Sequence, residues 1–192
     1  STISNESEVS QFSPSAFVVR EAGLWSAAPG LYLSRKNARL LSQPKDFVWV
    51  PSSSVATENV LLAVDGAEST RWSTGRPQAA GDSFTVTFDR EIELIKAEIS
   101  IRNTPTDFPR GLRVEQSTDG VTFLPITTLA DWHGPIRWTE SDAPYFGPPH
   151  DVTIQLPTAT RLRALRFVVI AGDPHFDWSI GELRVYAPEV AK

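Results

Sequence analysis

One stretch of the chain concentrates residue types that recognise small polar ligands. Residues 131–150 read DWHGPIRWTESDAPYFGPPH, with two tryptophans, a tyrosine, a phenylalanine, two histidines and an arginine. Aromatic rings present flat apolar surfaces to the C–H face of a sugar, and charged or imidazole groups can hydrogen-bond its hydroxyls. The candidate ligand contacts in this stretch are Trp132, His133, Arg137, Trp138 and Tyr145, with Asp142 and His150 as further polar partners.

The same composition fits a second interpretation. A loop rich in proline and aromatic residues can fold onto itself as an Ω-loop and bury its own rings as a small satellite cluster. The sequence leaves open whether Trp132 and Trp138 form a platform or pack inside a lid.

A second candidate contact lies in GDPHFDW, residues 172–178. His175 and Phe176 fall at the tip of this predicted loop, where loops on a rigid scaffold accumulate binding residues. Asp177 and Trp178 lead into the last strand, and we expect them to pack.

The elements that must position these loops are strands. Apolar and polar residues alternate in SFTVTF, where Phe84, Val86 and Phe88 share one face, and again in LIKAEISIR at 94–102. Further predicted strands are GLRVEQS, FLPITTL, DVTIQL, RALRFVVIAG and ELRVYAP. The expected breaks between strands are Gly81-Asp82, Asp119-Gly120, Pro157 and Gly172-Asp173-Pro174.

A short helix is expected in TENVLLAVDG, with Thr57 as its N-cap. Many short strands and one helical turn predict an antiparallel β-sandwich.

The chain divides by composition into four parts. Residues 1–14 are polar and predict a flexible leader, and 189–192 form a tail. Residues 15–50 hold the strand-like runs FVVREAGLW, LYLSRKNARLL and FVWV, which we interpret as strands added to the sandwich rather than a small subdomain. Residues 51–188 make up the sandwich itself. The chain lacks Met even at position 1, so an excised or processed domain of a larger protein is expected.

Bulk properties exclude several functional classes. Cys is absent, which excludes disulfides, thiolate zinc sites and cysteine nucleophiles. The net charge of −5 argues against nucleic-acid binding, and no apolar run is long enough to cross a membrane. Neither a zinc-protease helix, a nucleophile elbow nor a phosphate-binding loop occurs. The prediction is therefore a protein that is not an enzyme.

Three segments in order carry a family resemblance. They are LLAVDGAESTRWSTGRPQAAGDSFTVTF, FPRGLRVEQSTDGVTFLPI and LRALRFVVIAGDPHFDWSIGELRVYAP. Together they resemble the discoidin family, the coagulation factor 5/8 type C domains, over about residues 52–188. The resemblance implies an all-β, antiparallel jelly-roll β-sandwich of the galactose-binding-domain-like kind, which binds ligands at its loop ends and performs no catalysis. Ser73 follows Trp72 where galactose-binding relatives often carry His, so the sugar stays open.

The resemblance also implies individual residues. Relatives often take ligand contacts from the connection that reads RNTPTDFPR here, which adds Arg102, Asn103 and Asp107, whereas Arg110 is expected to brace the strand start. Many relatives hold a structural calcium ion at positions matching Asp65, Thr70 and Glu182. Oxygen donors of this kind suit Ca²⁺.

The leading hypothesis is a carbohydrate-binding module of a larger extracytoplasmic protein (periplasmic, cell-surface or secreted), next to a catalytic or membrane domain. A protein-interaction domain without a sugar ligand is the alternative. Phospholipid binding is disfavoured, because Asp131, Glu140 and Asp142 outnumber the single Arg in the long loop.

Overall fold

A computed structural model gives the fold, and it describes residues 18–19, 25–26, 38–41, 48–101, 104–130, 136–146 and 151–188. The chain forms two compact units, one of residues 1–39 with 189–192 and one of residues 40–188. In the first unit, β1 (Val18–Val19) pairs with β2 (Trp25–Ser26) as a two-stranded antiparallel sheet.

The second unit is built on a seven-stranded antiparallel assembly in the order β3-β13-β6-β11-β7-β8, with β4 also pairing with β6. Its strands are β3 (Ala38–Leu41), β4 (Trp49–Ser53), β6 (Ser83–Ser100), β7 (Leu112–Ser117), β8 (Leu124–Leu129), β11 (Asp151–Val169) and β13 (Glu182–Pro188). Two smaller pairs complete it: β5 (Trp72–Ser73) with β12 (Ser179–Ile180), and β9 (Ile136–Trp138) with β10 (Pro144–Phe146). Of the strand runs in 15–50, those in β3 and β4 join the main assembly, whereas β1 and β2 pair with each other.

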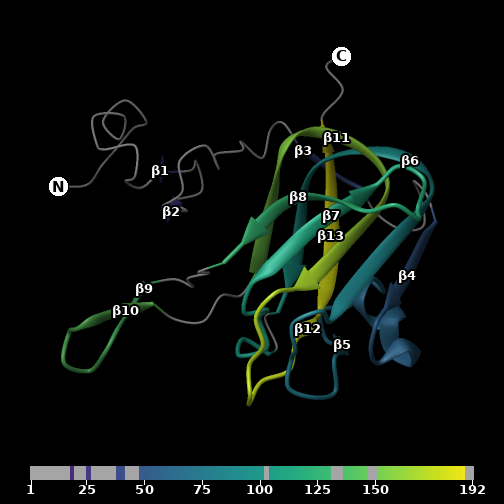
Figure 1. The fold of residues 1–192 in the computed structure, drawn as a ribbon. Coiled ribbons are helices and arrows are strands. Elements are labelled where there is room, and N and C mark those ends of the chain that lie inside the picture. Colours follow the sequence, from purple (N-terminus) through teal and green to yellow (C-terminus); the bar gives the residue numbers. More distant parts are fainter. Residues whose placement is uncertain are drawn as a thin grey trace. The chain divides into compact units, whose positions relative to one another are not determined.

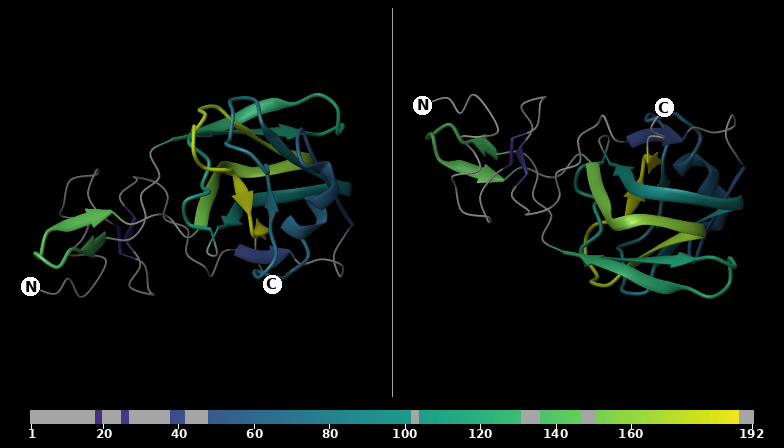
Figure 2. Two further views of the ribbon diagram at one scale, coloured as in Figure 1. Left: turned by 90° about the horizontal axis from the view of Figure 1, so that it is seen from below. Right: turned by 90° about the horizontal axis from the view of Figure 1, so that it is seen from above.

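The strands β6 and β11 each belong to both layers of the sandwich. The first part of β6 lies between β4 and the end of β11, while its last part lies between β13 and the start of β11. Figure 1 shows both strands curving over one end of the sandwich, and Figure 2 gives two further views of the layers. The fold is thus an all-β jelly-roll sandwich, as predicted.

The strand break predicted at Pro157 is wrong, because β11 runs through this residue. The register against β6 shifts between Gln155 and Thr160, so Pro157 lies in a bulge where no partner of β6 requires its missing N–H. Likewise, the two runs SFTVTF and LIKAEISIR belong to one strand, whose exposed residues 89–91 mark the bend between the layers.

The core between the layers is one apolar cluster. Phe84, Val86 and Phe88 of β6 are buried, which confirms their predicted shared face. At one end Trp72 packs edge-on against Trp178, with ring centroids 5.1 Å apart. Both tryptophans are fully buried, so together they fill this end of the core.

The predicted helix is a 3₁₀ helix, η2 (Thr57–Ala63), and its cap differs from the prediction. Ala56 is the N-cap, in the left-handed region with φ of 50°, and no side chain caps the helix. The carbonyl of Ala56 instead accepts a hydrogen bond from the indole of buried Trp72 at 3.1 Å, so a tertiary contact holds this turn. No described helix has the length and apolar character needed to cross a membrane.

Candidate functional site

Three connections of the sandwich are tied together by hydrogen bonds, and we call them the anchored loops: residues 74–82, 104–111 and 171–178. At their centre lies Gln78, which is only 2% exposed. Its side-chain amide donates to the carbonyls of Phe108 and Asp177, both at 3.1 Å. Its carbonyl oxygen accepts from the backbone N–H of Arg110 at 2.9 Å. One buried side chain therefore bonds to the other two loops.

Backbone contacts of Gln78 reinforce this junction. Its N–H donates to the carbonyl of Phe176 at 3.0 Å, and its carbonyl accepts from the N–H of Asp173 at 3.0 Å. The 171–178 loop also passes close to this backbone, because a Cβ on Gly172 would lie 3.1 Å from the Gln78 carbonyl oxygen. Gln78 was not predicted as a site residue, since a lone Gln in a stretch of loop residues carries no pattern that indicates burial.

Arg110 has a structural role, as predicted, and its side-chain contacts are with the anchored loops. Its guanidinium pairs with Asp173 at 2.7 Å and donates to the carbonyls of Phe108 at 2.8 Å and Thr106 at 3.0 Å. The guanidinium also lies over the ring of Phe108, 3.8 Å from the centroid, and 5.5 Å from that of Phe176. Arg110 is thus committed to internal contacts.

The tip of the 171–178 loop is set by Asp173. Its carboxylate accepts hydrogen bonds from the N–H groups of His175 at 2.8 Å and Phe176 at 3.0 Å. The N–H of His175 lowers the pKa of Asp173, and the N–H of Phe176 and the Arg110 guanidinium lower it further despite partial desolvation. The backbone therefore holds both residues in place while their side chains are exposed, Phe176 by 40%.

Asp177 and Trp178 face inward, as expected for packing residues. The carboxylate of Asp177 accepts from the hydroxyl of Ser73 at 2.8 Å. The backbone N–H of Trp178 donates to the Thr74 hydroxyl at 3.1 Å, and its ring is part of the core.

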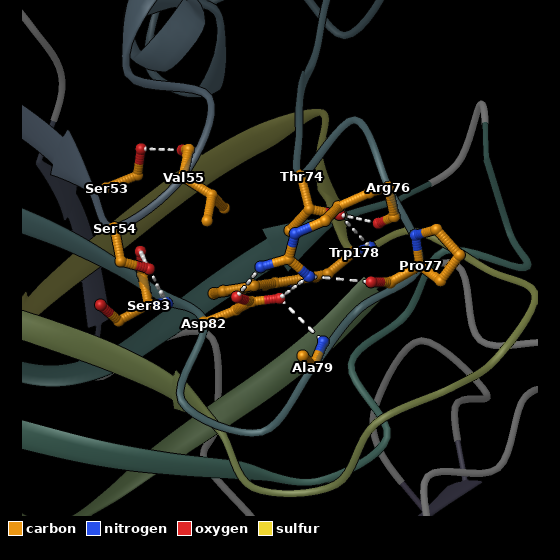
Figure 3. A network of polar contacts seen from close by, with 10 residues as sticks. All are labelled: Ser53, Ser54, Val55, Thr74, Arg76, Pro77, Ala79, Asp82, Ser83 and Trp178. Carbon is orange, nitrogen blue, oxygen red and sulfur yellow. Dashed lines mark hydrogen bonds and ion pairs between the residues drawn. The ribbon is translucent and has the colours of Figure 1, made fainter.

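The 74–82 loop is closed by an ion pair that the sequence did not single out. Figure 3 shows the guanidinium of Arg76 facing the carboxylate of Asp82, with atom separations of 2.5 and 3.0 Å. Asp82 is buried and also accepts from the N–H of Ala79 at 2.8 Å. These contacts link the two ends of the loop that carries Gln78.

The 104–111 loop contains one predicted contact, Asp107. It is buried, and its carboxylate accepts from the hydroxyls of Ser179 at 2.8 Å and Thr106 at 3.1 Å. Its side chain is therefore engaged inside the protein. The neighbouring candidates Arg102 and Asn103 lie outside the described residues.

The predicted contacts in 131–150 fall on the β9–β10 hairpin and its flanks. Trp138 is 65% exposed, and Tyr145 is also exposed. The described part of the stretch thus presents these two rings to solvent rather than burying them. Trp132, His133 and His150 lie outside the described residues, and Arg137 is described only as a member of β9.

The three predicted calcium ligands come together at the 65–70 loop. The Thr70 hydroxyl donates to Asp65 at 2.7 Å, and the N–H of Gly66 donates to the carboxylate of Glu182 at 3.0 Å. Burial raises the pKa of Glu182 to about 7, and the negative charges of Asp65 and Glu68 contribute to the increase. Within the described residues, no three His, Asp or Glu side chains gather closely enough to hold a metal ion by themselves.

Comparison with known proteins agrees with this architecture. The family model for the F5/8 type C domain matches residues 50–182. No curated protein sequence matches the chain.

Solved structures with the same fold include three with bound sugars. The family 32 carbohydrate-binding module of C. perfringens NanJ in complex with galactose has a TM-score of 0.58 at 17% identity, covering 78% of this chain and 98% of that one. A Clostridium perfringens module in complex with GalNAc-β-1,3-galactose has a TM-score of 0.56 at 20% identity, covering 78% and 100%. The module of AlyQ in complex with 4,5-unsaturated mannuronic acid has a TM-score of 0.52 at 17% identity, covering 73% and 95%.

Proposed function

Because the chain belongs to the F5/8 type C domain family, we propose that it is a non-catalytic carbohydrate-binding module. The observation that carries this proposal is the exposed pair His175 and Phe176, fixed at the tip of a braced loop. A ring held in place by its backbone loses little conformational freedom when a sugar stacks on it. The similar structures named above hold sugars, which supports the same ligand class here.

Each side chain at the tip has a defined role in this proposal. The exposed face of Phe176 stacks against the C–H face of a pyranose, and the imidazole of His175 hydrogen-bonds a hydroxyl. Arg102 and Asn103, from the adjoining connection, are the proposed partners for the remaining hydroxyls. On the hairpin, Trp138 and Tyr145 would provide a second contact area, together with Trp132, His133 and Arg137.

A binding experiment with one matched control tests the proposal. We expect calorimetric titration with galactose and GalNAc-β-1,3-galactose to show saturable binding, which Phe176→Ala weakens by about tenfold or more through loss of the stacked ring. Leu61→Ala removes another exposed apolar side chain, from η2, and should leave the affinity unchanged. Unchanged affinity in Phe176→Ala would contradict the proposed site. No binding across a broad glycan panel would favour the protein-interaction alternative.

We further propose one structural calcium ion at the 65–70 loop. The donors there are oxygens, and Glu182 is a buried carboxylate beside two other negative charges, so a bound cation would offset their repulsion. Asp65 and Glu182 would supply carboxylate oxygens, and Thr70 together with carbonyls of the loop would supply the others. The ion would hold the loop against the last strand and take no part in catalysis.

The proposed setting is a larger extracytoplasmic protein. The module would bind a glycan and raise the local concentration of a neighbouring catalytic domain on its substrate. Low affinity at one site suffices for this role when the target carries many copies of the sugar.

A further inference from the structure

The backbone of Phe176 is fixed, but its backbone bonds do not set the direction of its ring. The N–H of Phe176 donates to Asp173 at 3.0 Å, and its carbonyl accepts from the N–H of Gln78 at 3.0 Å. These bonds place the Cβ atom and leave rotation about χ1 free among the staggered rotamers. Because the ring is 40% exposed, core packing alone does not select one of them.

The group that lies over this ring is the guanidinium of Arg110. Its central carbon is 5.5 Å from the centroid of the Phe176 ring, within the range of a cation–π contact. Among the described residues, no aromatic pair and no other cation involves this ring. One face of the ring therefore lies toward Arg110, and the opposite face is left for a ligand.

The guanidinium is itself held firmly. Each of its three nitrogens donates a hydrogen bond: Nε to Asp173 at 2.7 Å, Nη1 to the carbonyl of Phe108 at 2.8 Å and Nη2 to the carbonyl of Thr106 at 3.0 Å. The side chain of Arg110 is only 20% exposed. A planar group bound at all three nitrogens has little freedom to rotate, so the ring of Phe176 rests against a fixed surface.

One carboxylate joins the restraints on the backbone to those on the cation. Oδ2 of Asp173 accepts from Arg110, while Oδ1 accepts from the N–H groups of His175 and Phe176. The same residue thus sets the position of the loop tip and of the guanidinium beside it. The geometry of the ring is therefore determined inside the protein, before any ligand arrives.

We propose that Arg110 is a positioning residue for the sugar site: it holds the Phe176 ring in the rotamer that stacks on a pyranose, without touching the sugar. This inference rests on the proposed function and names the residue that controls one of its contact areas. Without Arg110 the ring would spread over about three rotamers, of which one is competent to bind. The apparent dissociation constant would then rise about threefold, in inverse proportion to the competent population.

Two matched variants test this inference. Arg110→Met keeps the length of the side chain and removes its charged plane. Arg166→Met removes an equivalent group elsewhere, because Arg166 lies 3.8 Å from the centroid of the Phe123 ring and pairs with Glu115. Both variants should lower the unfolding temperature. Only Arg110→Met should weaken the binding of GalNAc-β-1,3-galactose, by about threefold in calorimetric titration, and Arg110→Lys should bind with intermediate affinity because it retains the charge without the plane.

A double-mutant cycle shows whether Arg110 acts through the ring. In the Phe176→Ala background, Arg110→Met should cause no further loss of affinity, because no ring is left to orient. A further threefold loss there would assign Arg110 to the general shape of the anchored loops or to direct contact with the sugar, and would overturn the inference. Unchanged affinity in Arg110→Met alone would overturn it as well.

NMR relaxation of the ring needs no ligand and so separates this inference from the proposed function. The Cζ–Hζ bond of Phe176 lies on the axis of ring flips, so its relaxation reports jumps of χ1 on the picosecond to nanosecond timescale. We expect restrained motion in the wild type and in Arg166→Met, and greater mobility in Arg110→Met. Equal mobility in the three proteins overturns the inference whether or not a sugar binds. Greater mobility in Arg110→Met without binding of any glycan would remove the proposed function while confirming that Arg110 orients the ring.

Discussion

The anchored loops and the β9–β10 hairpin use similar residues in opposite ways. In the anchored loops, buried polar side chains such as Gln78 and Asp82 hold the backbone, and only the tip residues His175 and Phe176 are exposed. In the hairpin, the described side chains are exposed, and the hydrogen bonds lie mainly within the turn itself. Both regions are rich in aromatic residues, so aromatic content does not distinguish a preorganised contact from an open surface. The difference lies in the buried polar side chains that hold the anchored loops.

The largest expected effect separates two tryptophans. Trp178→Ala removes a fully buried ring that packs on Trp72, so the free energy of unfolding should fall by about 3–5 kcal/mol. Trp138→Ala, in the hairpin, should change it by less than about 0.5 kcal/mol because the ring is exposed. Urea unfolding measures both. Similar losses in the two variants would show that the hairpin is part of the core.

Replacing Gln78 tests whether the anchored loops depend on one side chain. Gln78→Leu leaves two carbonyls and the N–H of Arg110 without their partner, so we expect a loss of about 2–4 kcal/mol in the free energy of unfolding. Sugar binding through Phe176 should weaken, while binding at the hairpin should be unaffected. Calorimetric titration of Gln78→Leu, with Phe176→Ala and Trp138→Ala as reference variants, separates the two effects. Equal weakening at both surfaces would contradict the distinction between them.

Glu182 gives a smaller effect that depends on pH. Its pKa is raised from 4.5 to about 7, so the folded protein binds this proton more tightly than the unfolded chain. The contribution is therefore most favourable below pH about 4.5, and the free energy of unfolding should fall by about 2–3 kcal/mol as pH rises to about 7. Glu182→Gln should remove this slope in urea unfolding with a chelator present. Exposed Glu93→Gln should keep it. A slope that Glu182→Gln leaves unchanged would assign it to another group.

Much of the fold follows from local pattern. Alternation in SFTVTF predicted the buried face of Phe84, Val86 and Phe88, and the structure confirms it. The turn at Asp119-Gly120 is also confirmed: Asp119 accepts from the N–H groups of Val121 and Thr122, and Gly120 has φ of 79°. These features depend on neighbours in sequence, which is why the sequence reveals them.

The site was less predictable, because its geometry depends on distant partners. The role of Gln78 comes from atoms of Phe108, Arg110 and Asp177, which no local pattern connects. Similarly, the composition around Trp138 suits a platform and a self-packed lid equally well. Only tertiary structure decides which face of a strand pair is covered. The strand break predicted at Pro157 does not occur, and this too depends on tertiary structure. A bulge in β11 leaves no residue of β6 that needs a hydrogen bond from the N–H that proline lacks.

The long pairing of β6 with β11 also has a kinetic consequence. Even its nearest pair in sequence, Ser100 with Asp151, closes a loop that contains β7, β8 and the whole hairpin. Proteins dominated by such distant contacts fold slowly. The entropy of closing a loop grows only with the logarithm of its length, about 0.6 kcal/mol for each doubling. The length of the segment between β8 and β11 can therefore change at little entropic cost to the pairing of β6 with β11.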